Sequence, residues 1–106
     1  MTIGVLLSGC GVYDGAEIQE SVLTLLAIEE IGAKALCISV DAPQHHVVNH
    51  ITGEEMPESR NMMIEAARIA RGAVKNINDV DPVDIDALVI PGGFGSAKNF
   101  TKWAFD

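Results

Sequence analysis

Residues 3–40 read IGVLLSGCGVYDGAEIQESVLTLLAIEEIGAKALCISV, and the class of fold follows from them. The stretch begins with a short apolar run, residues 3–7, and ends with a second one, residues 35–40. Short continuous apolar runs are typical of strands that are buried on both faces of a parallel sheet. A helical pattern separates the two runs, so the stretch predicts a β-α-β unit with parallel strands and a right-handed crossover.

The helix of this unit is expected over residues 15–31. Asp14, with Glu17 three positions later, matches a capping box at the start of a helix. Gly32 stands where a left-handed residue commonly ends a helix. The apolar positions form a wide stripe, so we expect most of the helix to be buried. These positions are Ile18, Val22, Leu25, Leu26 and Ile28.

The rest of the chain predicts one more clear helix, residues 59–71, and one more buried strand, residues 87–90. Weaker patterns indicate an extended excursion that ends in a turn at Thr52-Gly53-Glu54, a short strand at 74–77 and a further element over residues 96–105.

These elements predict an α/β protein with a flavodoxin-like, doubly wound parallel sheet. The first strand is expected between the other two clear strands, because Gly9 and Gly92 then face the same switch point. Three clear strands are few for such a sheet, so residues 1–106 are expected to be the N-terminal part of a single domain whose remainder is missing. The alternative is a small domain that closes its open edge as a homodimer.

The charge of the chain limits its partners. The 106 residues include 7 Lys plus Arg and 15 Asp plus Glu, which gives a formal net charge of −8. Such a chain lacks the basic footprint that nucleic acid requires, and an anionic membrane surface would repel it. Two cysteines make no disulfide framework, and the apolar start is too short and lacks the basic residues of a secretory signal. A cytoplasmic protein is therefore expected.

Four segments of the chain occur together, in this order, in a known family. They are SGCGVYDGAEIQESVLTLLAIEEIGA at 8–33, VVNHITGE at 47–54, RNMMIEAARIARG at 60–72 and DALVIPGGFGSAKNF at 86–100. The chain thereby resembles the ElbB family of enhancing lycopene biosynthesis proteins, also described as isoprenoid biosynthesis proteins with an amidotransferase-like domain. That family is similar to the PfpI-like hydrolases, deglycases and glyoxalases of the class I glutamine amidotransferase-like superfamily.

The resemblance implies an active site built on tight turns. In the superfamily a Glu early in the first helix contacts a cysteine nucleophile, and a Gly-Gly turn offers backbone N–H groups as an oxyanion hole. By motif, Glu20 matches the catalytic Glu, and Gly92 with Gly93 matches the oxyanion turn. The nucleophile is expected beyond Asp106, so the 106-residue chain alone is expected to be inactive.

The implied reaction is of the glyoxalase type and needs no cofactor. A thiolate adds to a small 2-oxoaldehyde such as glyoxal, Glu20 shuttles the proton, and a 2-hydroxy acid is released. The partner is then a small aldehyde or another small molecule. The alternative is a non-catalytic binding or regulatory module tied to isoprenoid metabolism, because a fold does not determine a function.

Cys10 follows the first strand, and we expect it to line the substrate pocket rather than to act as the nucleophile. Three nearby carboxylates would raise the pKa of its thiol. These are Asp14, Glu17 and Glu20. His50 lies in a family-like segment and is also expected to line the pocket, whereas Cys37, inside a strand, is expected in the core.

Neither the histidines nor the arginines of the middle segment predict a ligand site. His45, His46 and His50 lack matching Cys or carboxylate spacing, so no metal is expected. Three arginines alternate with two glutamates, which favours a solvated, paired helix face over an anion site. These residues are Glu58, Arg60, Glu65, Arg68 and Arg71.

A dinucleotide site is the main rival interpretation. Gly9-Cys10-Gly11 follows a strand, and Asp41 ends the next strand, as in a dinucleotide-binding fingerprint. The glycine spacing is one residue too long, however, and Asp14 with Glu17 crowds the helix start, where a pyrophosphate needs free N–H groups. We therefore expect no binding of NAD or FAD.

Overall fold

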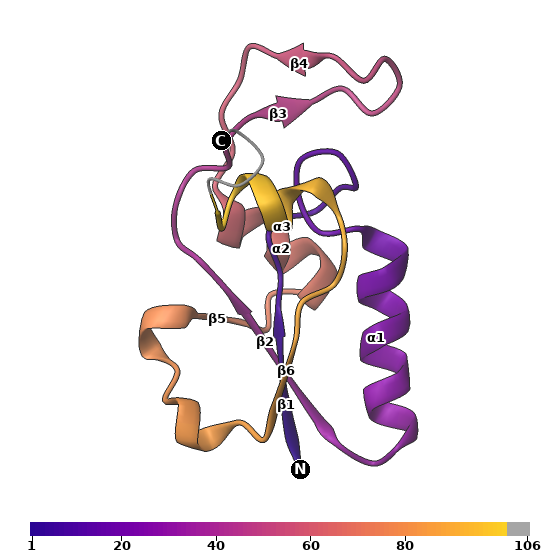
Figure 1. Cartoon of the computed structure of the whole chain (residues 1–106), viewed down its shortest axis with the longest axis vertical. Coiled ribbons are helices and arrows are strands. Elements are labelled where there is room, and N and C mark those ends of the chain that lie inside the picture. Colours follow the sequence, from indigo (N-terminus) through magenta and orange to yellow (C-terminus); the bar gives the residue numbers. More distant parts are fainter. Residues whose placement is uncertain (102–106) are drawn as a thin grey trace.

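The computed structural model describes residues 1–101, which form a parallel sheet, flanking helices and a small hairpin (Figure 1). The strands are β1 (Thr2–Leu6), β2 (Lys34–Ser39), β3 (Val47–Val48), β4 (Glu55–Met56), β5 (Val74–Asn76) and β6 (Ala87–Val89). The helices are α1 (Ile18–Glu30), α2 (Met62–Ala70) and α3 (Phe94–Lys98), with two short 3₁₀ turns, η1 (Ile77–Asp79) and η2 (Pro82–Asp84). The element expected over 96–105 thus begins earlier, as α3, and residues 102–105 lie outside the described part.

The main sheet has the strand order β5-β2-β1-β6, and its strands are all parallel. Val5 on β1 pairs with Cys37 on β2 at one side and with Val89 on β6 at the other. The prediction that the first strand lies between the other two is therefore confirmed. The weakly indicated strand near residue 74 is also present, as the edge strand β5. The α/β, flavodoxin-like class is confirmed with it.

Alternate residues of β1 point to opposite faces of the sheet. Ile3 and Val5 belong to the buried cluster that contains Ile28 of α1 and Ala66 of α2, so both helices cover this face. On the other face, Gly4 leaves room for three apolar side chains. These are Ile38, Ile85 and Leu88, whose Cδ1 atoms would lie 3.1, 3.2 and 3.3 Å from a Cβ at Gly4.

The start of α1 differs from the prediction. Its N-cap is Glu17, whose side chain accepts a hydrogen bond from the backbone N–H of Glu20, and Asp14 takes no part in the cap. Residues 11–16 form a closed loop instead. Gly11 N–H donates to Ala16 O (2.8 Å), and Gly15 N–H donates to Gly11 O (2.8 Å). Because the loop uses these residues, the helix begins at Ile18 rather than at residue 15.

The expectation that this helix is mostly buried is wrong for this chain. Ser21 and Ile28 are the buried residues of α1. Four of its apolar side chains are 44–62% exposed: Ile18, Val22, Leu23 and Leu26. One side of the helix packs on β2 and α2, and residues 1–101 supply no element that covers the other side.

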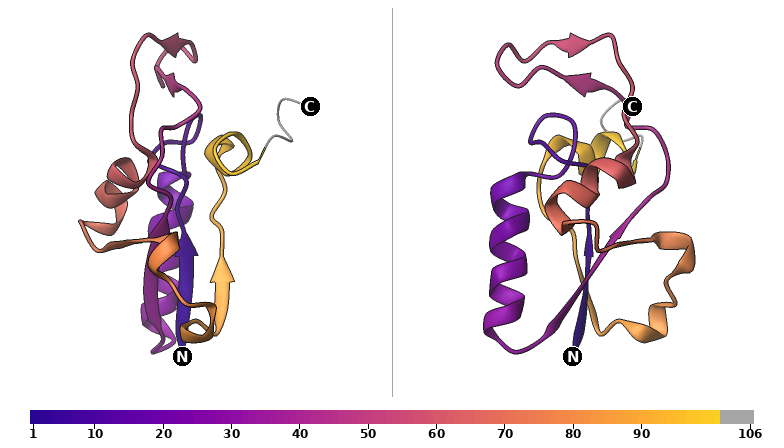
Figure 2. Two further views of the ribbon diagram at one scale, coloured as in Figure 1. Left: turned by 90° about the vertical axis from the view of Figure 1, so that its left-hand side faces the viewer. Right: turned by 180° about the vertical axis from the view of Figure 1, so that it is seen from behind.

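The segment between β2 and α2 leaves the sheet as an antiparallel hairpin, with Val47 of β3 opposite Met56 of β4. Its turn is the one expected around Gly53, where Asn49 N–H donates to Glu54 O at 2.8 Å. Figures 1 and 2 show the hairpin at the end of the molecule opposite the N-terminus, near α3 and the loop after β1. The sheet therefore gathers these three parts at the carboxyl ends of its strands.

The second helix, α2, keeps the expected position but is shorter at both ends. Asn61 caps it by accepting from Ile64 N–H at 2.9 Å. Arg71 ends it in the left-handed conformation (φ 55°), directly before Gly72.

Candidate functional site

The loop after β1 and the turn after β6 are joined because β1 and β6 are neighbours in the sheet. Three backbone hydrogen bonds connect the two segments. They run from Glu17 N–H to Gly92 O (2.7 Å), from Phe94 N–H to Val12 O (2.8 Å) and from Gly95 N–H to Gly15 O (3.0 Å). The start of α1 is thereby held against the glycine turn.

This arrangement brings Glu20 next to Gly92. A Cβ at Gly92 would lie 2.7 Å from Glu20 Oε1 and 2.9 Å from Oε2, so the carboxylate occupies the space that any other side chain would need. Glu20 itself is exposed, in the first turn of α1. The structure thus places a solvent-accessible carboxylate directly over the turn that follows β6.

Gly93 is constrained by both its conformation and its neighbours. Its φ is +115°, which L side chains rarely adopt, and a Cβ there would contact Gly15 O and lie 2.6 Å from Glu17 N. A cavity of about 240 Å³, lined by Val12, Gly93 and Phe94, opens beside the turn. The three residues predicted by motif, Glu20, Gly92 and Gly93, therefore form one cluster next to an open space.

Cys10 and His50 belong to a second, separate group of polar residues. They line a cavity of about 100 Å³ between the loop after β1, the hairpin and α2. Its polar lining residues are Cys10, Asp14, Gln44, His50, Arg60 and Glu65. Neither Glu20 nor the glycine turn lines this cavity. The five residues that the sequence assigned to one pocket therefore lie in two groups: Glu20, Gly92 and Gly93 at the glycine turn, and Cys10 with His50 in this cavity.

The pKa of the Cys10 thiol is raised, in the direction that the sequence predicted. Burial is the largest cause, followed by the negative charge of Glu65; Arg68 opposes the rise, and Asp14 adds to it. The sequence attributed the rise to three carboxylates in the loop and the helix start. Of these, Asp14 is the one that acts on Cys10. The Glu17 carboxylate instead accepts from Glu20 N–H, and the Glu20 carboxylate lies over Gly92.

The expectation of a solvated charge face on α2 is wrong for Glu65. The residue is 6% exposed, and its carboxylate lies 3.0 Å from Arg60 Nη1 and 3.3 Å from Arg68 Nε. Arg60 also pairs with exposed Glu58 at 2.6 Å. The ion pairs exist, but they enclose a buried carboxylate beside Cys10.

Two backbone groups hold the ring of His50. Its Nδ1–H donates to Val48 O at 3.0 Å, and its Nε2 accepts from Tyr13 N–H at 3.2 Å. The ring stacks on Tyr13 with a centroid distance of 4.8 Å. Asp14, 5% exposed, accepts from Val48 N–H at 2.8 Å, and its other oxygen lies 3.8 Å from His50 Nε2. Both side chains thus fasten the hairpin to the loop after β1.

Two residues at the C-terminal end of α3, Lys98 and the C-cap Asn99, connect the same segments and were not singled out by the sequence analysis. Asn99 donates to Ser8 O (2.7 Å) and Asp14 O (3.0 Å) and accepts from His45 N–H (2.7 Å). Lys98 Nζ donates to Tyr13 O at 3.0 Å. Both residues lie in the segment PGGFGSAKN, and the resemblance of this segment to the family could have identified them.

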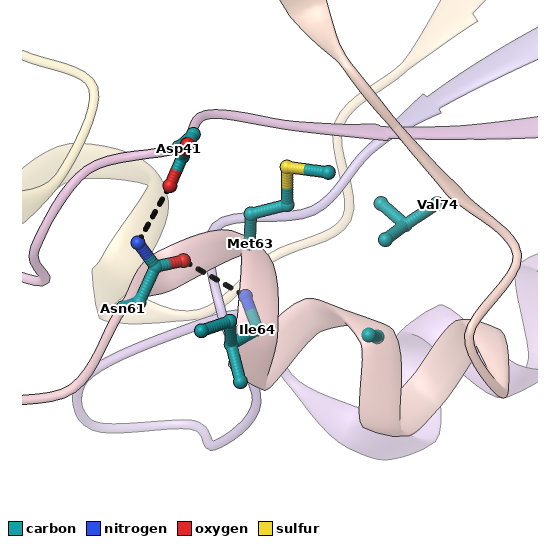
Figure 3. Close-up of a pocket in the computed structure, with 6 residues that line it drawn as sticks. Asp41, Asn61, Met63, Ile64 and Val74 are labelled. Atoms are coloured by element: carbon teal, nitrogen blue, oxygen red, sulfur yellow. Dashed lines mark hydrogen bonds between the residues drawn. The ribbon is translucent and has the colours of Figure 1, made fainter.

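Figure 3 shows a different cavity, of about 310 Å³, beside α2. Asp41, the acidic residue of the rival dinucleotide interpretation, accepts from Asn61 Nδ2 at 2.8 Å. Asn61 in turn caps α2, and the rest of the lining is apolar: Met63, Ile64, Ala67 and Val74. This cavity contains none of the residues that form the Glu20 cluster. The expected absence of NAD or FAD binding stays a prediction.

Among residues 1–101, no three His, Cys, Asp or Glu side chains gather as a metal ion would require. The rings of His45 and His46 form a T-shaped pair with centroids 5.0 Å apart, while His50 lies with Asp14 and Tyr13.

A comparison with solved structures identifies the architecture that carries this site. The crystal structure of an isoprenoid biosynthesis protein with an amidotransferase-like domain from Ehrlichia chaffeensis matches 96% of the chain, with a TM-score of 0.94 and 42% sequence identity. The resemblance of the chain to ElbB-type amidotransferase-like proteins is therefore confirmed. No family model matches the chain. The assignment therefore depends on individual relatives.

Three curated proteins are similar to this chain over 98% of its length. They are "ES1 protein homolog, mitochondrial" of Rattus norvegicus (45% identity), "Glutamine amidotransferase-like class 1 domain-containing protein 3, mitochondrial" of Homo sapiens (43%) and "ES1 protein, mitochondrial" of Danio rerio (34%). The match covers 40%, 39% and 40% of these proteins and 48% of the Ehrlichia chain. The chain thus spans about two fifths of the length of the curated relatives.

The expectation of a cytoplasmic protein is wrong, because all three of these relatives are described as mitochondrial. The sequence argument used the lack of a secretory signal and the lack of a disulfide framework, and these features do not distinguish mitochondria from the cytoplasm. None of the helices in the described part of the chain has the length and hydrophobicity that a membrane crossing requires.

Proposed function

We propose that the chain contributes the proton carrier and the oxyanion turn of a cofactor-free, thiol-dependent enzyme that hydrates small 2-oxoaldehydes to 2-hydroxy acids. The contact between Glu20 and Gly92 supports this proposal most directly. A carboxylate over a glycine turn combines a group that moves protons with backbone N–H groups that can approach a developing oxyanion. The Ehrlichia relative is an isoprenoid biosynthesis protein, which extends the proposal to a link with isoprenoid biosynthesis.

The proposed reaction converts glyoxal and water into glycolic acid. A thiolate forms a C–S bond with one aldehyde carbon, and the C=O electron pair moves to the oxygen, which the Gly92–Gly93 turn stabilises. Glu20 removes the proton from this carbon and delivers it to the neighbouring carbonyl carbon, whose oxygen also takes up a proton. Water then cleaves the resulting thioester and restores the thiol. One carbon is oxidised while its neighbour is reduced, so no external oxidant is needed.

We propose that the thiol comes from outside these 106 residues. Cys37 is buried in β2, and Cys10 lies in the cavity with Glu65, where its pKa is raised. The chain spans 48% of the solved relative, so the family domain includes residues that could supply a nucleophile.

The second candidate is a non-catalytic binding module of the same fold. The raised pKa values of Cys10 and Cys37 fit this candidate, because thiols that stay protonated at neutral pH are poor nucleophiles and the chain itself then offers none. The enzyme predicts turnover that depends on Glu20, whereas the binding module predicts no turnover.

The deciding experiment uses two proteins: residues 1–106, and a form extended to the length of the relatives. We expect glycolate formation from glyoxal with the extended form and none with the short form. In the extended form Glu20→Gln keeps the shape and removes the titrating group, so the rate should fall roughly 10²–10⁴-fold, the usual contribution of general acid–base catalysis.

Glu29→Gln is the matched control, since Glu29 is exposed near the far end of the same helix. It should leave the rate unchanged, and Cys10→Ser should stay near the unsubstituted protein. An extended protein that lacks turnover supports the binding module. Turnover by the short form that Cys10→Ser abolishes would show that the nucleophile is Cys10.

A further inference from the structure

A cavity near the glycine turn is built by four separate segments. It has a volume of about 490 Å³ and lies between the loop after β1, the residues before and within β3, the hairpin turn and α3. Its lining residues are Tyr13, His46, Val48, Gly53, Phe94 and Lys98. The aromatic side chains are accessible, because Tyr13 is 38% and Phe94 56% exposed. Phe94 also borders the cavity beside Gly93, so the two spaces are adjacent.

Lys98 is positioned in this cavity by two neutral acceptors. Its Nζ lies 3.0 Å from Tyr13 O and 2.9 Å from His46 Nε2, and it stands 5.3 Å from the centroid of the Phe94 ring. An ammonium group has three N–H donors, so one remains after these two contacts. Holding a flexible lysine in place beforehand reduces the entropy that a ligand would otherwise lose on binding.

His46 supports Lys98 as an acceptor and does not add a second charge. The pKa of His46 is lowered, first by burial and then by the nearby charge of Lys98 and by His45; Glu55 and Asp14 act in the opposite direction with smaller effect. A neutral imidazole with its Nε2 lone pair toward Lys98 fits this direction.

The charge of Lys98 has no partner of opposite sign in the part of the chain that the structure describes. No carboxylate of residues 1–101 forms an ion pair with its Nζ, and none lines the cavity. The chain as a whole carries a net charge of −8. The described residues therefore place a cation beside two aromatic rings without pairing it to a carboxylate, in a chain whose net charge is negative.

We propose that this cavity binds a small organic anion, whose carboxylate or phosphate group contacts Lys98 and whose apolar or aromatic body packs on Tyr13 and Phe94. The cation matches the acidic group, and the exposed rings match the body. This inference concerns binding alone and does not depend on the proposed hydration of aldehydes.

The test is an NMR titration of residues 1–106 with four probes: phenylacetate, phenyl phosphate, neutral phenylacetamide and inorganic phosphate. We expect saturable binding of the two aromatic anions with dissociation constants of roughly 0.1–10 mM, as one charged contact on a small ligand allows. Amide shifts should change at the residues that line the cavity. Phenylacetamide and inorganic phosphate should each bind at least about 10-fold more weakly, because each lacks one of the two contacts. The stronger aromatic anion identifies the preferred acidic group.

Variants then assign the contact to Lys98. Lys98→Gln should weaken the aromatic anions by about 10-fold or more, while Lys98→Arg should retain most of the binding because the charge is kept. Lys75→Gln on the exposed part of β5 changes the net charge equally and should have no effect.

Three results would overturn the proposal. The first is equal binding of phenylacetate and phenylacetamide to the unsubstituted chain, a comparison that does not require any variant to fold. The second is no saturable binding of either aromatic anion, and the third is shifts confined to residues outside the cavity. None of these results bears on turnover of glyoxal, so the binding site and the proposed enzyme are judged separately.

Discussion

Cys10 lies at the end of β1, at the edge where ligands bind in parallel sheets, yet its surroundings oppose a reactive thiolate. Burial and the charge of Glu65 raise the pKa of its thiol above the ordinary value of 9.0. Because the thiolate is the reactive form, a raised pKa lowers reactivity at neutral pH. The position of Cys10 in the fold is therefore not sufficient to make it a nucleophile.

We predict that iodoacetamide modifies Cys10 slowly at pH 7.5, and that the rate rises only at a higher pH than for a free thiol. The thiolate fraction is small below a raised pKa and grows as the pH passes it. Glu65→Gln removes the second-largest cause of the rise, so it should shift the rate–pH profile to lower pH. Peptide mapping by mass spectrometry measures the modification of Cys10 alone.

Glu58→Gln is the control for this profile. Glu58 also pairs with Arg60, but it is exposed and does not contribute to the pKa of Cys10. The explanation fails if both glutamate variants shift the profile equally, or if Cys10 reacts at pH 7.5 as fast as a free thiol.

At the scale of elements, the loop after β1 and the turn after β6 behave as one unit. Backbone atoms approach so closely that Gly93 and Gly95 have no room for a Cβ against Gly15. This contact holds the start of α1, and with it Glu20, over the turn. The glycines of PGGFG thus position the candidate site because they have no side chain that would keep the two segments apart.

We predict that Gly93→Ala destabilises the chain much more than Gly53→Ala. Both glycines have positive φ, +115° and +78°, but a Cβ at Gly53 meets nothing within 4 Å. Gly53→Ala should therefore cost about 1 kcal/mol for conformation alone. Gly93→Ala should cost roughly 3 kcal/mol or more, because the backbone must also move away from Gly15 and Glu17. Urea unfolding followed by circular dichroism measures both changes, and equal costs would contradict the steric explanation.

At the scale of the whole molecule, the two faces of the sheet are covered unequally. Both long helices contribute to the core on one face, while the segment from η1 to Ile85 lies against the other. That second face holds a cavity of about 300 Å³ with an apolar lining: Leu6, Ile38, Ile77, Val80, Pro82, Ile85 and Leu88. Leu88 is 52% exposed, although it lies on a strand of the sheet. The homodimer that the sequence left open stays a prediction.

We predict that residues 1–106 bind an uncharged hydrophobic dye such as Nile red at this face. Leu88→Asp introduces a charge beside the cavity and should reduce the dye fluorescence roughly 2-fold or more, because a contiguous apolar patch is interrupted. Val83→Asp is the control, since Val83 is 81% exposed but does not line the cavity. Weak fluorescence of the unsubstituted chain, or an equal loss in both variants, would refute the prediction that this apolar face is exposed.

The local pattern of residues 3–40 was sufficient to predict a parallel β-α-β unit. A strand buried on two faces appears as a continuous apolar run, and a helix buried along one stripe appears as apolar residues at helical spacing. The place of β1 between β2 and β6 followed from the general topology of such sheets. The pairing of Glu20 with Gly92 was predicted only through the family motifs, and it follows physically from β1 and β6 being neighbours.

The tertiary structure alone decided the roles of Asp14, Glu65 and Lys98. Asp14 matched a capping pattern, but its carboxylate accepts from Val48 N–H, 34 residues away. Glu65 occupies a helical position that is polar by pattern, and it is buried because the loop with Cys10 packs on that side of α2. Lys98 meets His46 across 52 residues. Contacts over such separations depend on how the hairpin and α3 close over the sheet edge, and no local period in the sequence encodes that closure.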